Sequence, residues 1–336
     1  MGVLAAGSPS AAGAQEVAAQ AEEPRAPVPS RGPLRVQERN PLYRLFLSPV
    51  AESADLVGPG RWEAHLSTSY SNIFELSDSP RHAQYFDLER LAILLTLRYG
   101  LAPKVEVGMS VGMRTDWGGF LDRFIRGWHD AFGFPQGNRD DAPDGAHGLI
   151  LVEGGARRVD LEAGTAWEDV RAFAGWSLAG SRDARRALTL RGALKLPVGG
   201  VDRGTSGRMG GSLELAGRVS GRRTHLHGSL GAVHLRPPDR LEPFTRDWAL
   251  TASLGVEHAL SPAVAFAGQL VGGSAYVGGF GAADLDRIPL NLVVGLTGRV
   301  ARGWGWQASF AEDLVARGPS VDFTLDLQIS RRWGGG

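Results

Sequence analysis

The clearest indication of the fold is VDFTLDLQISRRW, the sequence of residues 321–333. Up to Ile329 its odd-numbered residues are apolar and its even-numbered residues are polar, so a β-strand formed here has one apolar and one polar face. Similar segments recur from Arg61 onward, joined by short turns at one end and longer polar loops at the other. This arrangement predicts an all-β fold, a transmembrane antiparallel up-and-down β-barrel.

About twelve segments carry this alternation. They are residues 61–71, 85–99, 105–114, 167–179, 186–196, 211–220, 224–235, 248–259, 263–275, 289–300, 304–315 and 320–333. The stretch 147–163 is either a further hairpin of the wall or a hairpin within the loop after the third strand. Because barrels of this class have an even number of strands, twelve or fourteen are allowed, and we expect twelve.

A soluble β-sandwich or barrel is the alternative, since its strands alternate just as strictly. Three features favour the membrane: the even strand count, polar faces that carry spaced charges with many Gly and Ser, and aromatic residues at strand ends. These aromatic residues are Tyr70, Tyr99, Trp304 and Trp333. The apolar runs, such as residues 91–95, are far shorter than the roughly 20 residues of a membrane-spanning helix.

The composition excludes several classes of function. The chain has 36 basic and 36 acidic residues, so it lacks the positive surface that nucleic acid requires. It contains no cysteine, which excludes disulfides, thiol nucleophiles and Cys-ligated zinc. We expect no cofactor and no metal ion.

The N-terminal region differs from the rest of the chain. Residues 1–14 are small and apolar and end in Ala-Gly-Ala, the form of a secretory cleavage site, so we interpret them as the remnant of a signal peptide. An Ala/Gly-rich leader is the alternative. Residues 15–39 are rich in Pro, Ala, Glu and Arg, a composition that cannot fold alone, and we expect a disordered linker there. The barrel is then expected over residues 40–333.

One amphipathic helix is expected in the loop after the third strand. Residues 117–134 place apolar side chains at helical spacing on one face and charged ones on the other, and Gly133 and Pro135 are stop signals. The helix could constrict the barrel mouth, lie in the membrane interface, dock a partner, or simply pack on the rim. Its candidate residues are Phe120, Phe124, Trp128, His129, Asp130 and Phe132.

The same region carries a resemblance. The blocks NPL at 40–42, PVAESA at 49–54 with Gly60, GFLDRFI at 119–125 and WHDAFGFPQGNRD at 128–140 resemble an uncharacterised proteobacterial family of outer-membrane β-barrels. The resemblance implies this architecture and a location in the bacterial outer membrane, with outer-membrane lipid as a partner. It implies no activity, because the family has none established.

The last strand resembles the C-terminal signal that outer-membrane barrels present to the barrel assembly machinery. It differs from that signal in two ways, because three glycines follow Trp333 and because Arg331 occupies a position that is usually apolar. Because the alternating apolar residues and the terminal aromatic residue of the signal are present, we expect the assembly machinery as a second partner despite these two departures.

The polar faces of the strands supply the candidate lumen. The residues expected to line a pore are Arg90, Arg98, Lys104, Glu106, Arg114, Arg191, Lys195, Glu214, Arg218, Arg299, Asp322 and Asp326. Charges of both signs can make a weakly anion-preferring channel or a set of salt bridges that fills the interior, and twelve strands leave an intermediate bore. We expect a narrow channel for small solutes; the alternative is a non-conducting barrel that docks a partner through its helix.

An enzyme is a third hypothesis, and we expect none. The candidates are His225 and His227, which simply repeat with the strand period, and His129 beside Asp130. The one Gly-x-Ser-x-Gly sequence, GMSVG at 108–112, lies inside the alternating segment 105–114 and not at the strand-to-helix turn that a serine nucleophile needs, and no third ligand accompanies the two strand histidines. Asp140, Asp141 and Asp144 could bind calcium loosely, but a solvated acidic loop explains them equally well.

Overall fold

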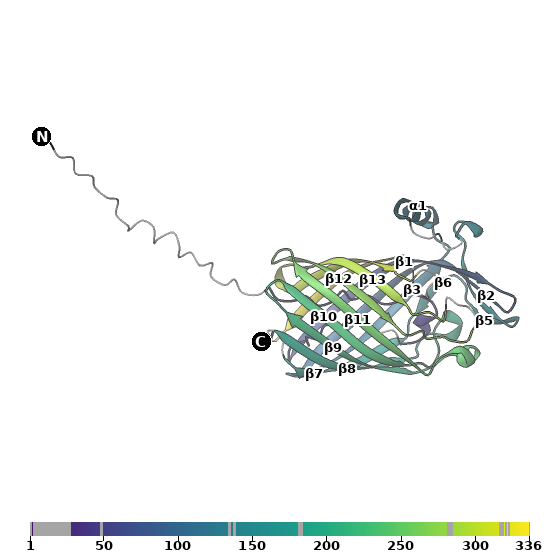
Figure 1. Cartoon of the computed structure of the whole chain (residues 1–336). Helices are drawn as coiled ribbons and strands as arrows, with labels where there is room; N and C mark the ends of the chain where they lie inside the picture. The colour runs from purple at the N-terminus through teal and green to yellow at the C-terminus, as the bar shows by residue number, and fades with distance from the viewer. Residues whose placement is uncertain are drawn as a thin grey trace.

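Twelve antiparallel strands close into a barrel in this computed structural model (Figure 1). The structure describes residues 28–47, 50–133, 139–180, 184–280, 285–315 and 323–335, together with residues 2, 136, 319 and 321. The signal-peptide remnant expected at 1–14, apart from residue 2, and the first part of the expected linker, 15–27, lie outside these residues.

The wall consists of strands that each pair with their neighbours in chain order. They are β1 (Arg61–Asp78), β2 (His82–Ala102), β3 (Val105–Trp117), β7 (Val170–Ala179), β8 (Arg186–Leu196), β9 (Gly210–Ser220), β10 (Thr224–His234), β11 (Trp248–Ala259), β12 (Val264–Gly273), β13 (Leu290–Arg299), β14 (Trp304–Asp313) and β15 (Phe323–Gly334). The first and last strands close the ring, with Trp62 opposite Trp333 and Asn72 opposite Phe323. The prediction of twelve wall strands is confirmed.

The remaining elements lie in the loops and in the N-terminal region. They are α1 (Asp122–Phe132), β4 (Gly148–Glu153), β5 (Ala156–Asp160), β6 (Gly164–Trp167), and the 3-10 helices η2 (Tyr43–Leu45), η3 (Arg139–Asp141), η4 (Val201–Arg203), η5 (Asp239–Phe244) and η6 (Ala301–Gly303). Strand β4 of the β4–β5 hairpin pairs with the first residues of β2, from His82 to Asp87, so the stretch 147–163 extends the sheet beyond the ring. Among the described residues, no helix is long and apolar enough to cross a membrane.

The two rims differ in the length of their connections. We call the end where β1 begins and β15 ends the near rim, and the opposite end the far rim. The connections between β2 and β3, β9 and β10, and β13 and β14 are short turns on the near rim. The longer loops, with α1 and the β4–β5 hairpin, lie toward the far rim (Figure 1).

The wall has an apolar outside and a polar inside. On β15, Leu325, Leu327 and Ile329 point outward and are exposed, whereas Asp326 and Gln328 point inward and are buried. Leu327 keeps 56% of its surface, against 3% for Asp326. A soluble barrel buries the apolar face instead, so this distribution is that of a membrane barrel.

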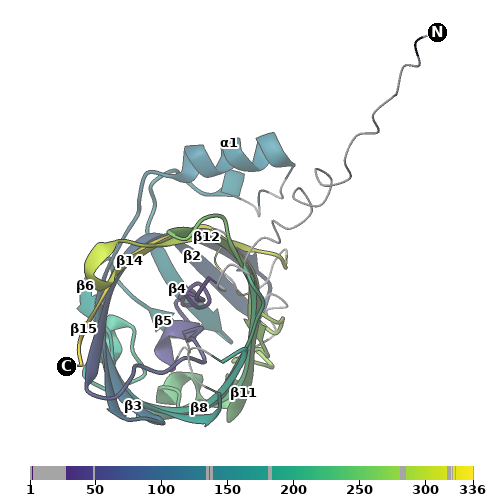
Figure 2. The ribbon, with the colours of Figure 1, turned by 90° about the vertical axis from the view of Figure 1, so that its left-hand side faces the viewer.

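The lumen is occupied by the protein's own N-terminal region, which runs through the ring of strands (Figure 2). We call residues 28–60 the plug, with an outbound leg, 28–47, and a return leg, 50–60. The outbound leg starts at the near rim, where Val28 N donates to Arg222 O, and the return leg ends there, where Gly60 N donates to Gly100 O. Between these points, η2 lies against residues of the far-rim loops.

Residues 28–39 therefore differ from the disordered linker that their composition indicates. Leu34 and Val36 are buried against Ala267 and Val293 of the inner wall. A segment too polar to fold alone becomes ordered here because the barrel supplies the surface against which it packs. Likewise, residues 40–60 belong to the plug and not to the wall.

Candidate functional site

The outbound leg is bound first by polar side chains of β11 and β12. Glu257 accepts hydrogen bonds from Ser30 Oγ at 2.7 Å and from Arg31 N at 2.9 Å. Further along, Gln269 bonds the plug backbone twice, accepting from Leu34 N at 3.0 Å and donating to Leu34 O at 2.8 Å. The wall thus completes the backbone hydrogen bonds that an extended segment lacks.

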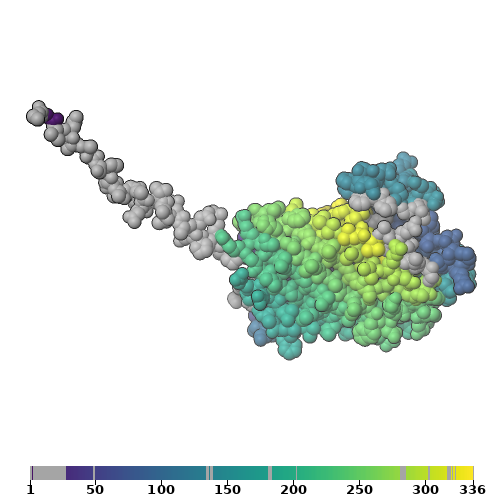
Figure 3. Space-filling model, viewed as in Figure 1, coloured from purple at the N-terminus to yellow at the C-terminus, as the bar shows by residue number. Residues whose placement is uncertain are grey.

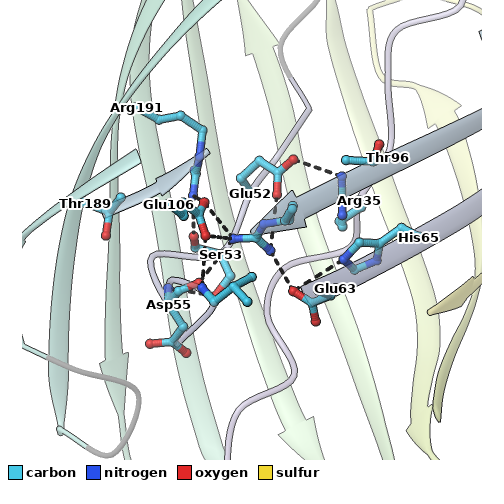
Figure 4. Close-up of polar contacts among 12 residues, drawn as sticks. Arg35, Glu52, Ser53, Asp55, Glu63, His65, Thr96, Glu106, Thr189 and Arg191 are labelled. Atoms are coloured by element: carbon cyan, nitrogen blue, oxygen red, sulfur yellow. Dashed lines mark hydrogen bonds and ion pairs between the residues drawn. The ribbon is translucent and has the colours of Figure 1, made fainter. Parts of the chain in front are cut away.

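A buried carboxylate, Glu52, joins the two legs of the plug to the wall (Figure 4). Its Oε1 lies 2.9 Å from Arg35 Nη2 of the outbound leg and 3.7 Å from Arg171 Nη1 of the wall. Its Oε2 lies 3.9 Å from Arg98 Nη1 of the wall. Burial alone would raise the pKa of Glu52, but the guanidinium groups of Arg35, Arg98 and Arg191 lower it to about 2. Glu52 is therefore charged at neutral pH, where it balances positive charge that the lumen would otherwise leave unpaired.

A second carboxylate, Glu106 on β3, holds the return leg from the wall side. Its Oε2 accepts a hydrogen bond from Val57 N at 3.0 Å. It also binds Arg98 Nη2 at 2.8 Å and Arg191 Nη2 at 3.0 Å. Both arginines reach on to plug carbonyls, Arg191 Nη2 to Ser53 O at 3.2 Å, so one wall carboxylate orients two donors for the plug.

The return leg is also positioned by two contacts with side chains of β8 and β9. Asp55 Oδ1 lies 2.9 Å from Arg218 Nη2, and Thr189 Oγ1 donates to Ala54 O at 2.6 Å. The methyl group of Ala54 belongs to one buried cluster with Ala187 and Ala216. Small residues on both sides let the plug backbone approach the wall closely.

The far end of the plug is apolar. Leu42, Tyr43, Leu45, Phe46 and Leu47 are all buried. They belong to one cluster with residues of the far-rim loops and strands, which are Phe86, Leu149, Leu151, Leu235, Leu241, Tyr276, Phe280 and Leu285. The Tyr43 and Tyr276 rings lie 4.2 Å apart between centroids. This cluster seals the far mouth of the barrel.

Charged wall residues surround the apolar cluster. Arg90 binds Asp116 through two contacts, Nε–Oδ1 at 2.6 Å and Nη2–Oδ2 at 2.8 Å, and donates to Arg39 O at 3.0 Å. Lys195 Nζ lies 2.7 Å from Asp169 and donates to Leu45 O at 2.9 Å. Each cation therefore has one carboxylate of the barrel and one plug carbonyl among its partners, and Lys195 also donates to Ser206 Oγ at 2.6 Å.

A small cavity remains between the plug and the wall strands β9 to β13. It has a volume of about 60 Å³ and is lined by Glu38, Tyr43, Ser229, Ser253 and Asn291, among others. A water molecule takes roughly 30 Å³ in the liquid, so this space holds only a few waters. It is too small for a sugar or an amino acid.

The structure places most of the predicted pore residues on the inner wall. Arg90, Arg98, Glu106, Arg114, Arg191, Lys195, Glu214, Arg218 and Asp326 are buried there, and Arg299 is half-buried with its guanidinium on Ser30 O. Lys104 instead lies exposed in the near-rim turn, because β2 ends at Ala102. Asp322 lies outside the described residues.

The predicted constriction helix is not in the lumen. Figure 2 shows α1 outside the ring of strands, so its residues do not narrow the mouth. Phe120, Phe124 and Phe132 are exposed, Asp130 is also exposed, Trp128 is half-buried and His129 is buried. The segment that fills the mouth is the plug.

The plug residues of the site were not identified by sequence reasoning. Arg35, Glu52 and Asp55 lie before the first alternating strand, and their charges repeat with no strand or helix period. The one available signal was the apolar run from Leu42 to Leu47, which a solvated linker would not carry.

His227, one of the histidines considered for catalysis, contacts residues that hold the plug. His227 Nε2 lies 3.2 Å from Glu257 and 3.4 Å from Ser30 Oγ, within the contacts that hold the outbound leg. In the described part of the chain, no three His, Asp or Glu side chains are grouped so as to hold a metal ion.

An apolar outer wall, a charged lumen and an internal plug define this protein as an outer-membrane-type β-barrel in fold. The family described as "Protein of unknown function (DUF3187)" matches residues 14–333, and the chain belongs to this family. No curated protein is similar to it in sequence.

Solved structures of outer-membrane proteins match this chain, among them the following two. The COG4313 outer membrane channel from Pseudomonas putida F1 is 14% identical, with a TM-score of 0.53 over 83% of this chain and 98% of that chain. The NanC porin is 7% identical, with a TM-score of 0.46 over 80% of this chain and 98% of that chain. At this identity the similarity to the COG4313 channel shows the fold alone.

Proposed function

We propose that this protein is a channel of the bacterial outer membrane for small solutes, closed by its own plug and opened when the plug is displaced. The observation that carries the proposal is the chemistry of the contact between plug and wall. Backbone-to-backbone hydrogen bonds join the two at the near rim, at Val28 and Gly60. Between these positions, side chains such as Arg191, Lys195 and Gln269 hold the plug.

Such contacts can be exchanged for water. When the return leg leaves, Arg98 and Arg191 keep Glu106, and Lys195 keeps Asp169, so the wall retains its own ion pairs. A strand inserted into the sheet could not leave in this way, because its neighbours would lose a ladder of backbone hydrogen bonds. The plug is thus a separable part of the fold.

The closed state should dominate. Opening breaks the ion pairs that Glu52 and Asp55 make with Arg171 and Arg218 of the wall. It also exposes the apolar cluster at the far end of the plug to water, which costs about 1.5–3 kcal/mol for each large side chain. Since each 1.4 kcal/mol is a factor of ten, openings should be rare in the unmodified protein.

The charge of the vacated lumen indicates the solute. Once the plug leaves with Glu52 and Asp55, the buried cations of the inner wall only slightly outnumber its buried carboxylates, which are Glu63, Glu106, Asp116, Glu214, Glu257 and Asp326. These cations are Arg90, Arg98, Arg114, Arg171, Arg191, Lys195 and Arg218. We therefore propose small anionic solutes, in agreement with the weak anion preference expected from the alternating charges.

A reversible lock tests the proposal. The chain has no cysteine, so Ala54→Cys with Ala216→Cys introduces a unique pair inside one buried alanine cluster that joins the plug to the wall. In a planar bilayer we expect rare anion-selective openings of the unmodified protein, none from the oxidised pair, and their return on reduction. The matched control is Ala54→Cys alone, which should respond to neither reagent.

A folded barrel that never conducts, even with the plug deleted, would contradict the proposal. It would favour the alternative of a non-conducting barrel that docks a partner. Folding is checked independently by the heat-dependent shift in gel mobility that closed barrels show.

We also propose that β15 is the strand recognised by the barrel assembly machinery. Its final aromatic residue, Trp333, is stacked on Trp62 with ring centroids 6.4 Å apart at the seam where the barrel closes. Trp333→Ala should reduce the amount of assembled barrel in cells, while Trp248→Ala, on an exposed ring distant from the seam, should not.

A further inference from the structure

Helix α1 is docked on the outer wall of the barrel near the far rim (Figure 3). Its rings meet outward-facing rings of the wall: Phe124 lies 6.3 Å from Phe323 of β15, and Trp128 lies 6.5 Å from Phe310 of β14, between centroids. Phe120 lies 6.1 Å from Tyr70 of β1. The helix therefore runs over the seam strands, on the side that faces away from the lumen.

This position is fixed by a carboxylate on the outer wall. Glu89 has the same outward parity as Leu91 and Ile93 of β2, yet it is fully buried. It accepts hydrogen bonds from the backbone of the segment that leads into α1, from Phe120 N at 2.7 Å and from Leu121 N. An outward carboxylate is costly in a membrane barrel unless it is covered, and here the helix segment covers it.

Gly119 makes this docking possible. Its φ of +81° is a left-handed conformation that favours glycine, and a Cβ at this position would overlap the Glu89 side chain. The backbone conformation of Gly119, just before α1, therefore permits the contact with Glu89 that positions the helix.

The buried side of α1 differs from the apolar face that the spacing predicts. Its buried residues are Asp122, Ile125 and His129, and two of these three belong to the predicted charged face. Phe120, Phe124 and Phe132 keep 73%, 52% and 61% of their surface. A helix that leaves three phenylalanines open has a partner other than water.

The exposed charged residues of α1 lie on a different edge from the phenylalanines. Arg123 and Asp130 are exposed, and they are separated from Phe124 and Phe132 by roughly a third to a half of a turn around the helix. Arg123 and Arg126 both contact Asp144 of the following loop. The helix therefore has a polar edge, an aromatic edge, and a third side that rests on the protein.

The aromatic edge continues the apolar surface of the barrel. Below Phe323 on the same strand, Leu325 and Leu327 are exposed and outward. Phe323 and Phe310, whose ring centroids are 5.2 Å apart, connect this band to the helix. We propose that α1 lies in the interface of the lipid bilayer and inserts Phe120, Phe124 and Phe132 among the lipids of the far-rim leaflet.

Three observations select lipid as the occupant. The phenylalanines extend a surface that the barrel already gives to lipid, aromatic rings are the side chains that membrane interfaces favour, and the charged edge points away from the band. The proposal goes beyond the channel proposal and is independent of it, since α1 would anchor an open barrel or a silent one equally well.

Spin labels test this placement. Because the chain lacks cysteine, Phe124→Cys and Phe132→Cys each give a single labelling site, and Arg123→Cys and Asp130→Cys are matched controls one and two positions away on the same helix. Leu327→Cys on the outer wall supplies the reference for lipid exposure. The full chain, refolded into phosphatidylcholine vesicles, is measured by collision with oxygen, which concentrates in lipid, and with a soluble nickel chelate.

We expect the oxygen-to-nickel collision ratio at 124 and 132 to be several-fold higher than at 123 and 130, and close to the ratio at 327. Equal, nickel-favouring ratios at all four helix positions would overturn the proposal, because the aromatic edge would then face water. Labels at 124 and 132 that neither reagent reaches would also overturn it, since a protein would then cover this edge.

Discussion

The near and far halves of the plug are held mainly by different contacts, although Arg44 of the far half also pairs with Glu168. Toward the near rim, Glu52 and Asp55 are surrounded by guanidinium groups, and plug carbonyls accept hydrogen bonds from the wall. Toward the far rim, Leu42 and Phe46 are packed in an apolar cluster with loop residues such as Leu241. The first kind of contact has direction and partner choice, whereas the second depends on the area removed from water.

This difference assigns a task to each half. Charged contacts can locate the plug in one register, because a shift of one residue would leave a buried charge without its partner. Apolar contacts stabilise closure without specifying register. The far half should therefore contribute more to the stability of the closed state, and the near half more to its accuracy.

The largest effect is expected when the apolar seal is removed. Tyr43→Ala combined with Phe46→Ala should weaken plug docking by about 6 kcal/mol, the sum of two large-to-small core changes. Displacement is measured as the rate at which a maleimide labels Ala54→Cys from water, which rises tenfold for each 1.4 kcal/mol. Phe124→Ala, on the outer wall, is the control and should leave the rate unchanged. A smaller effect than that of the next variant would reverse the assignment of the two halves.

The next effect is expected from the charged half. Glu52→Gln keeps the size of the side chain but leaves Arg35 and Arg171 without their carboxylate, which should cost about 3–5 kcal/mol. The labelling rate at Ala54→Cys should rise by about 100-fold or more. The control is Asp144→Asn, where the ion pairs are exposed and worth less than about 1 kcal/mol. Equal rates for both variants would show that the ion pairs do not hold the plug.

Acid separates the two halves further. The pKa of Glu52 falls from an ordinary 4.5 to about 2 in the closed state, so its contribution is complete above pH 4.5 and is lost as the pH falls toward 2. This difference is worth about 3 kcal/mol. As the pH falls from 4.5 toward 2, the free energy of plug docking should therefore decrease in the protein that retains Glu52. It should decrease less in the Glu52→Gln variant. Parallel pH profiles for the two proteins would exclude Glu52 as the titrating group.

The smallest effect concerns a region outside the lumen. Gly119→Ala should loosen α1 by about 1–3 kcal/mol, because alanine is strained at this φ and its methyl group meets Glu89. Gly127→Ala is the matched control: it lies within α1 with open space around it, and alanine favours a helix by about 1 kcal/mol. Hydrogen exchange of α1 should therefore speed up in the first variant and slow down in the second, with plug labelling unchanged in both.

The wall was predictable from the sequence, and the plug was not. The strand predicted over 320–333 is β15 (Phe323–Gly334), and it could be predicted because its environment changes between lipid and lumen at every residue, which leaves a period of two. Plug residues such as Arg35 and Glu52 have no such period, because each meets a different strand of a closed ring. The helix shows a third case, since its amphipathic pattern was evident but the pattern could not say that Ile125 faces protein while Phe124 is open.

Both ends of the plug leave the barrel through the same rim, at Val28 and at Gly60. The plug is therefore a loop pushed into a tube, and neither chain terminus has to pass through the ring of strands. The wall can close first, from β1 to β15, and receive the loop afterwards. For the same topological reason, the loop can be withdrawn and returned many times while every hydrogen bond of the ring stays in place.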